Sequence, residues 1–65
     1  MSAVLTKDEL TLLALLSRGL STDRVARQLG LSERTVRRHT RAICDRLGVA
    51  TPVEAVVWAA RRKLV

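Results

Sequence analysis

Four arginines fall within eight residues of the chain. If this segment is helical, their spacing of three and four residues places all four side chains on one side of the helix. Each guanidinium is a planar fork of hydrogen-bond donors that suits phosphate oxygens and the edge of guanine. The segment is therefore predicted to bind nucleic acid through Arg34, Arg37, Arg38 and Arg41.

Acidic residues are scarce in the same segment. A solvated surface helix normally mixes charges at four-residue spacing, yet no acidic residue lies between Glu33 and Asp45. The whole chain has a formal net charge of +6, from twelve Lys and Arg against six Asp and Glu. A merely solvated basic face remains the alternative interpretation.

A short turn, Gly30-Leu31-Ser32, precedes the arginine-rich segment. Ala26 is small enough to let two helices cross closely, and Gly30 allows the positive φ that reverses the chain. Leu31 and Val36 are expected to fill the angle between the helices. This spacing is typical of a helix-turn-helix, here over about residues 21–41, whose second helix enters the DNA major groove. An ordinary helical hairpin would have a similar pattern.

The chain is predicted to be all-α, with four helices over about residues 7–18, 22–29, 33–47 and 52–63. Thr6 with Glu9, and Thr51 with Glu54, have the spacing of a capping box, in which each side chain satisfies a backbone N–H at a helix start. Ser21 and Ser32 are suitable N-caps for the middle helices. Glycines 19, 30 and 48 follow the first three helices, where glycine commonly ends a helix.

Length and composition exclude several classes of protein. A chain of 65 residues forms one small domain, 1–65, without room for an enzyme-sized pocket. One Cys cannot form an intramolecular disulfide, and one Cys with one His cannot form a four-ligand zinc site. No nucleophile–base set and no phosphate-binding glycine loop is visible. We therefore expect no enzymatic activity, cofactor, metal, small-molecule ligand or membrane span.

Together, the motifs resemble the LuxR-type (GerE- or FixJ-type) DNA-binding domain of bacterial transcription regulators. The resemblance extends from Leu5 to Val65. It implies a four-helix helix-turn-helix domain that binds duplex DNA in the bacterial cytoplasm, with RNA polymerase as a further candidate partner. The motifs that carry it are Leu5-Thr6-Lys7-Asp8-Glu9, Gly19-Leu20-Ser21, Val25-Ala26, Ser32-Glu33-Arg34-Thr35-Val36-Arg37-Arg38-His39 and Ile43-Cys44-Asp45-Arg46-Leu47-Gly48-Val49.

The resemblance also implies roles for single residues. Base reading falls to Arg37, Arg38 and Arg41, and because arginine pairs with guanine we expect G·C pairs in the bound site. Phosphate contacts fall to Ser32, Arg34, Thr35 and Arg46.

Two positions depart from the family's pattern. Pro52 stands where the family often has an arginine, and it suits the start of a helix. Lys63 stands where the family has a glycine. The loss of that glycine predicts that the fourth helix runs further.

The fourth helix is apolar nearly all round. A helix packed on one domain needs a single apolar stripe, but Ala55, Trp58 and Ala59 lie off the main one. We therefore expect a homodimer through this helix, on an inverted repeat in DNA. Alternatively, Trp58 and the valines complete the core of the monomer. The predicted dimer stripe is Val53, Val56, Val57, Ala60 and Leu64.

Three residues outside these motifs have simple interpretations. We expect His39 to be structural or to face a phosphate, and Cys44 to be a small buried hydrophobe. Leu10 falls off the apolar stripe of the first helix and is expected to be exposed.

Sequence-specific binding of duplex DNA by a bacterial transcription regulator is the function that fits best. The alternatives are a sigma-factor-like promoter-recognition domain and an adaptor whose apolar fourth helix binds another protein.

Overall fold

The computed structural model describes residues 5–65, so the first four residues of the predicted domain lie outside the described part. It is all-α, as predicted, with four helices: α1 (Lys7–Ser17), α2 (Thr22–Leu29), α3 (Glu33–Leu47) and α4 (Pro52–Arg61). Within these residues, no helix is both long and apolar enough to cross a membrane.

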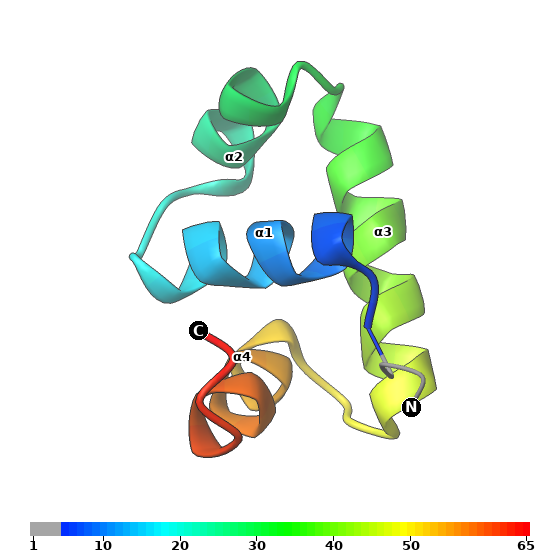
Figure 1. Ribbon diagram of the computed structural model, residues 1–65. Helices are drawn as coiled ribbons and strands as arrows, with labels where there is room; N and C mark the ends of the chain where they lie inside the picture. The colour runs from blue at the N-terminus through cyan, green and yellow to red at the C-terminus, as the bar shows by residue number, and fades with distance from the viewer. Residues whose placement is uncertain (1–4) are drawn as a thin grey trace.

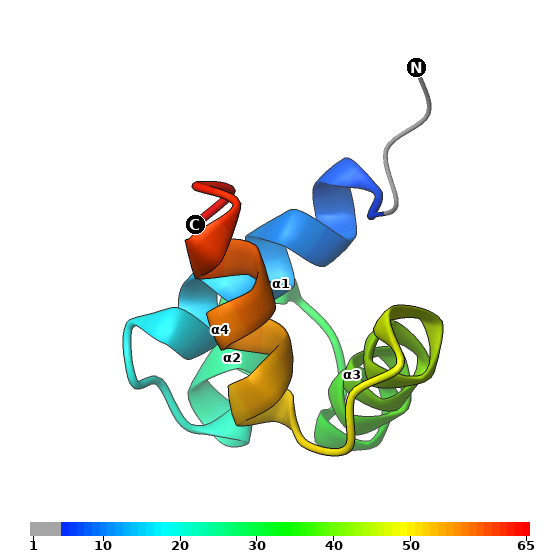
Figure 2. The same cartoon turned by 90° about the horizontal axis from the view of Figure 1, so that it is seen from below.

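Helix α1 lies at the centre of the fold and contacts the other three helices. Helix α3 stands along one side, and α2 and α4 lie on opposite sides of α1, α2 above it and α4 below it in the view of Figure 1 (Figures 1 and 2). Helices α2 and α4 each pack against α1 and α3 but not against each other. Helix α4 is therefore separated from α2 but in contact with α3, the second helix of the predicted helix-turn-helix.

The core is built from one face of each helix. Its largest fully buried side chains are Leu13 from α1, Val25 from α2, and Val36 and Ile43 from α3. Ala55 and Ala59 of α4 are also fully buried, and Trp58 is half-buried against the same cluster. The only buried polar side chain among residues 5–65 is Thr40, whose hydroxyl donates to the Val36 carbonyl at 2.8 Å.

The predicted caps form at all four helix starts, with one difference. At α1, the Thr6 hydroxyl accepts from the Glu9 N–H and the Glu9 carboxylate accepts from the Thr6 N–H, which completes a capping box. At α4, the Thr51 hydroxyl accepts from the Glu54 N–H, but it also donates to the Glu54 carboxylate at 3.2 Å. The second capping box is therefore replaced by a hydroxyl–carboxylate hydrogen bond.

The turn before α3 has the expected backbone but not all of the expected packing. Gly30 has φ +69°, in the left-handed region, and the Leu31 N–H bonds to the Ala26 carbonyl at 2.9 Å. Val36 is buried as predicted, whereas Leu31 is 38% exposed. Leu31 thus ends α2 through its backbone, and its side chain is only partly covered at the turn.

The predicted extension of α4 to residue 63 is wrong. The helix ends at Arg61, and Lys63 takes φ +57°, the conformation that a glycine would favour. The Lys63 and Leu64 N–H groups bond to the Ala60 and Ala59 carbonyls, at 3.0 and 2.9 Å. These two bonds form a Schellman motif, which satisfies the end of the helix. A left-handed lysine costs about 1 kcal/mol, and the two hydrogen bonds offset it.

Leu10 also differs from its prediction. It is half-buried and packs against the core cluster rather than lying exposed. Leu10 therefore lies at the edge of the apolar face of α1, because the buried face of this helix is wider than a single stripe of residues.

Candidate nucleic-acid interface

The two faces of α3 differ sharply. Its inner face buries Val36, Thr40, Ile43 and Cys44. Its outer face carries the four arginines of the sequence pattern, and all four are exposed: Arg34, Arg37, Arg38 and Arg41. The inward face fixes the rotation of α3 about its axis, so the guanidinium groups are presented together to solvent.

The first turn of α3 is held by its own side chains. The Ser32 hydroxyl accepts from the Thr35 N–H at 3.1 Å and donates to the Thr35 hydroxyl at 2.9 Å. The start of a helix carries a partial positive charge from its unpaired N–H groups, which favours an anion there. Ser32, Arg34 and Thr35 therefore lie at the end of α3 that carries this partial positive charge.

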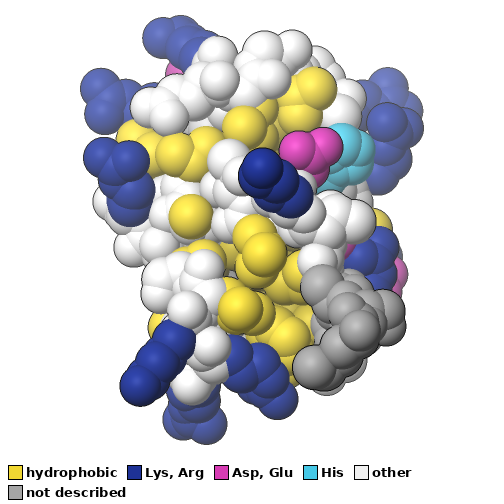
Figure 3. All heavy atoms as spheres, in the orientation of Figure 1, with side chains coloured by type: hydrophobic (Ala, Val, Ile, Leu, Met, Phe, Trp, Pro, Cys, Tyr) yellow, Lys and Arg dark blue, Asp and Glu magenta, His cyan; other side chains and the backbone are white. Residues whose placement is uncertain are grey.

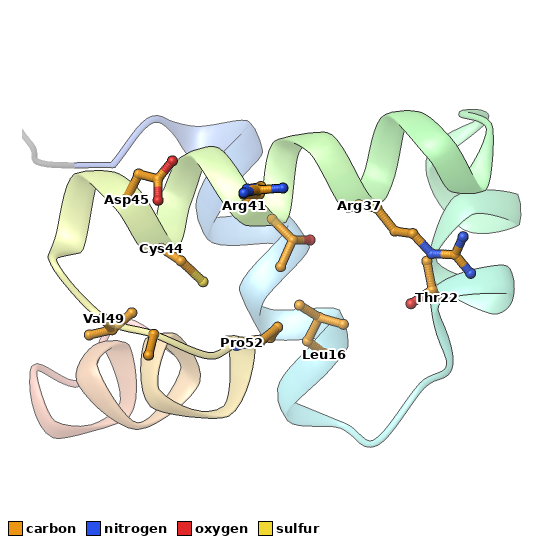
Figure 4. A pocket seen from close by; sticks show the side chains of 10 residues that line it. Leu16, Thr22, Arg37, Arg41, Cys44, Asp45, Val49 and Pro52 are labelled. Atoms are coloured by element: carbon orange, nitrogen blue, oxygen red, sulfur yellow. The ribbon is translucent and has the colours of Figure 1, made fainter.

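A groove runs beside the outer face of α3. It has a volume of about 510 Å³, and its walls come from α3, from the end of α1 and from the beginnings of α2 and α4. Arg37 and Arg41 lie one turn apart on one wall, and the Arg37 side chain extends toward Thr22 (Figure 4). Leu16 and Pro52 form part of the apolar wall opposite.

Cys44 lines the same groove and is buried, as predicted for a small hydrophobe. Burial raises the pKa of its thiol, and the nearby carboxylates of Asp45 and Glu54 raise it further. The side chain is therefore a neutral thiol at neutral pH and not a reactive thiolate.

His39 is exposed on α3. A structural role in the core is thereby excluded, and the phosphate-facing interpretation stays a prediction.

Arg46 lies apart from the other arginines. It is nine residues beyond Arg37, which is about 13 Å along a helix, and it pairs with Glu9 of α1 through a 2.5 Å contact from Nη1 to Oε1. The sequence pattern did not indicate this contact, because the two residues are 37 positions apart.

Glu9 connects the start of α1 to the end of α3. Burial alone would raise its pKa, but the Thr6 N–H, the Arg46 hydrogen bond and the Arg46 charge together lower it below the ordinary value. The carboxylate is therefore held in its charged form, and the capping box and the interhelix ion pair share one group.

Among residues 5–65, no group of three or more His, Cys, Asp or Glu side chains could hold a metal ion.

The comparisons with known proteins agree with this geometry. The family model GerE, of the bacterial regulatory proteins of the luxR family, matches residues 3–59. A solved structure of the transcription factor GerE superposes with a TM-score of 0.90 and 33% identity, over 97% of this chain and 94% of that chain. The DNA-binding transcriptional activator DevR/DosR of Mycobacterium tuberculosis (strain ATCC 25618 / H37Rv) is 37% identical over 59 residues, which is 91% of this chain.

The fold and the basic outer face of α3 define a helix-turn-helix DNA-binding domain of a transcription regulator. The chain belongs to the luxR family of bacterial regulatory proteins. This family is one of DNA-binding domains and not of enzymes, so the expected absence of enzymatic activity is confirmed. The chain spans 27% of the length of DevR/DosR.

Because the pKa of Glu9 is lowered in the folded domain, the free energy of unfolding should depend on pH in the acidic range. Because the folded pKa lies below the unfolded one, Glu9 stabilises the fold above the unfolded value near 4.5, and this contribution is lost as pH falls through the folded pKa. Glu9→Gln should therefore lower the free energy of unfolding by about 1–2 kcal/mol at pH 7. The difference from the wild type should narrow at lower pH, measured by urea unfolding followed by circular dichroism.

Asp8→Asn is the matched control, since it removes an exposed carboxylate from the same turn. If both variants lost the same stability at every pH, the hydrogen bonds of Glu9 would have no special role.

Proposed function

We propose that α3 enters the major groove of duplex DNA and that Arg37, Arg38 and Arg41 read the edges of bases there. The observation that carries this proposal is the exposure of all three on one side of a helix whose other side is buried. An α-helix fits the major groove, where a guanidinium can donate two hydrogen bonds to guanine O6 and N7. The preferred site should accordingly contain G·C pairs.

We further propose that Ser32, Arg34, Thr35 and Arg46 contact phosphates. The first three support this role through their place at the positive end of α3. Arg46 lies at the other end of the helix and shares its guanidinium with Glu9.

Base reading by Arg37 is tested by removing it. Arg37→Ala should weaken binding to a preferred duplex, selected from a random-sequence pool by the wild type, by about 1–3 kcal/mol. Binding to a scrambled duplex should change much less, so that the ratio of the two affinities falls. Fluorescence anisotropy with labelled duplexes measures both.

The matched control is Arg27→Ala on α2. Arg27 is exposed, as Arg37 is. Each of the two pairs with an acid four residues earlier at 3.3 Å, Arg27 with Asp23 and Arg37 with Glu33. Its removal should leave the affinity ratio unchanged. Equal losses on the preferred and scrambled duplexes for Arg37→Ala would contradict base reading.

A homodimer through α4 is the second part of the proposal. Helix α4 turns Ala55 and Ala59 into the core and leaves a line of apolar side chains outside. Val53 is 72% exposed, Val57 43% and Leu64 44%, and Ala60 is exposed as well. Hydrophobic side chains are visible on both halves of this face of the molecule, including the half where α4 lies (Figure 3).

The residues expected at the dimer contact differ in burial. Val56 is half-buried and packs against the core, as does Trp58, so these two contribute to the monomer first. The Arg62 guanidinium covers the Trp58 ring at 4.0 Å. The proposed dimer contact is thus Val53, Val57, Ala60 and Leu64, with Val56 at its edge.

Pairing of two copies through α4 would set two α3 helices about one DNA turn apart, roughly 34 Å, and select an inverted repeat. We propose that the domain regulates transcription in this form in the bacterial cytoplasm, with RNA polymerase as a further partner. The relative DevR/DosR, which is named a transcriptional activator, supports a role in transcription.

Val57→Glu tests the dimer. Because Val57 is 43% exposed, the variant should fold with a melting temperature close to that of the wild type. A charge at the centre of an apolar contact should abolish cooperative binding to a duplex with two inverted half-sites and spare binding to one half-site. Gel-shift titrations on the two duplexes measure this difference.

Gln28→Glu adds the same charge to an exposed position on α2 and is the control. It should retain cooperativity. Undiminished cooperativity in Val57→Glu would place the dimer contact elsewhere, and unfolding of the variant would place Val57 in the core.

A further inference from the structure

Glu33 is the first residue of α3 and pairs with Arg37, one turn later. The distance from Glu33 Oε2 to Arg37 Nη2 is 3.3 Å. Both side chains stay accessible, at 41% and 70% exposure, so the ion pair lies on the surface that α3 presents. Of the four arginines on this face, Arg37 alone is ion-paired within residues 5–65.

We propose that Glu33 is a specificity-determining residue that acts through Arg37. It directs the Arg37 guanidinium to a guanine edge and away from phosphates. This inference rests on the proposed base reading by Arg37. The interface thereby contains an acidic residue whose role is discrimination and not affinity.

The chemistry follows from what a guanidinium offers to each target. Attraction to a phosphate depends mainly on net charge, and Glu33 neutralises the charge of Arg37. Pairing with guanine depends on two directed N–H donors, and a guanidinium has five. One donor on Nη2 can stay with Glu33 while two others face guanine O6 and N7. The ion pair should therefore weaken phosphate binding more than guanine binding.

The carboxylate also limits the positions of the Arg37 side chain. A free arginine side chain loses considerable rotamer freedom when it is fixed on a base. The hydrogen bond to Glu33 restricts this freedom before DNA arrives, as preorganisation does in other interfaces. On a duplex without guanine at the matching position, the restricted guanidinium finds no matching pair of acceptors.

The experiment compares Glu33→Gln with Asp23→Asn. Each substitution removes one negative charge and one ion pair of 3.3 Å at i,i+4 spacing, but only the first affects α3. The probes are the duplex selected by the wild type and a scrambled duplex of the same composition. Glu33→Gln should raise affinity for the scrambled duplex about three- to fivefold, as expected for loss of one exposed ion pair. Its affinity for the selected duplex should rise less, so the ratio of the affinities for the selected and scrambled duplexes should fall.

Asp23→Asn should change both affinities by the same factor and keep the ratio. The proposal would be overturned if Glu33→Gln kept the wild-type ratio of the affinities for the selected and scrambled duplexes. It would also be overturned if Asp23→Asn lowered this ratio as much as Glu33→Gln does.

A double-mutant cycle separates action through Arg37 from a general charge effect. In an Arg37→Ala background, Glu33→Gln should no longer change the affinity ratio. If Glu33→Gln lowered the affinity ratio as much in the Arg37→Ala background as in the wild type, the proposal would also be overturned, because Glu33 would then act independently of Arg37. The failure of base reading itself looks different: Arg37→Ala alone would then leave the ratio at the wild-type value.

Discussion

The burial of one face of α3 determines nearly everything that the domain can present to a partner. Val36 and Ile43 are fully buried in the core cluster to which Leu13 of α1 and Val25 of α2 also belong. A helix fixed along one side cannot rotate about its axis, so its opposite side always faces outward. The positions of the arginines in sequence therefore become a fixed basic surface in space.

The same core yields a second surface of different chemistry. Only the small side chains Ala55 and Ala59 of α4 are fully buried, and this leaves Val53 and Val57 exposed on the other side. The basic surface of α3 is suited to a charged polymer, and the apolar surface of α4 is suited to another protein surface. Helices α3 and α4 contact each other, so the two surfaces belong to one rigid arrangement.

Much of the fold followed from local chemistry in the sequence. Caps at Thr6, Ser21 and Ser32 set the helix starts, and Gly30 set the turn. The left-handed conformation of Lys63 could not be predicted, because it depends on two backbone hydrogen bonds that form only at the end of α4. The pairing of Glu9 with Arg46 joins residues 37 positions apart and depends on how α1 crosses α3.

The Glu33–Arg37 ion pair, in contrast, could be predicted from its four-residue spacing alone.

Binding of duplex DNA by the basic face of α3 is tested most directly by its salt dependence. The affinity of the wild-type domain for the selected duplex should be measured by fluorescence anisotropy from about 50 to 200 mM salt. With Arg34 and Arg46 at phosphates, the logarithm of the association constant should fall linearly with the logarithm of salt concentration, with a slope of about −2 or steeper for each domain. The selected duplex should stay tighter than the scrambled one throughout. An affinity that barely responds to salt, or that is equal for both duplexes, would contradict sequence-specific DNA binding by this face.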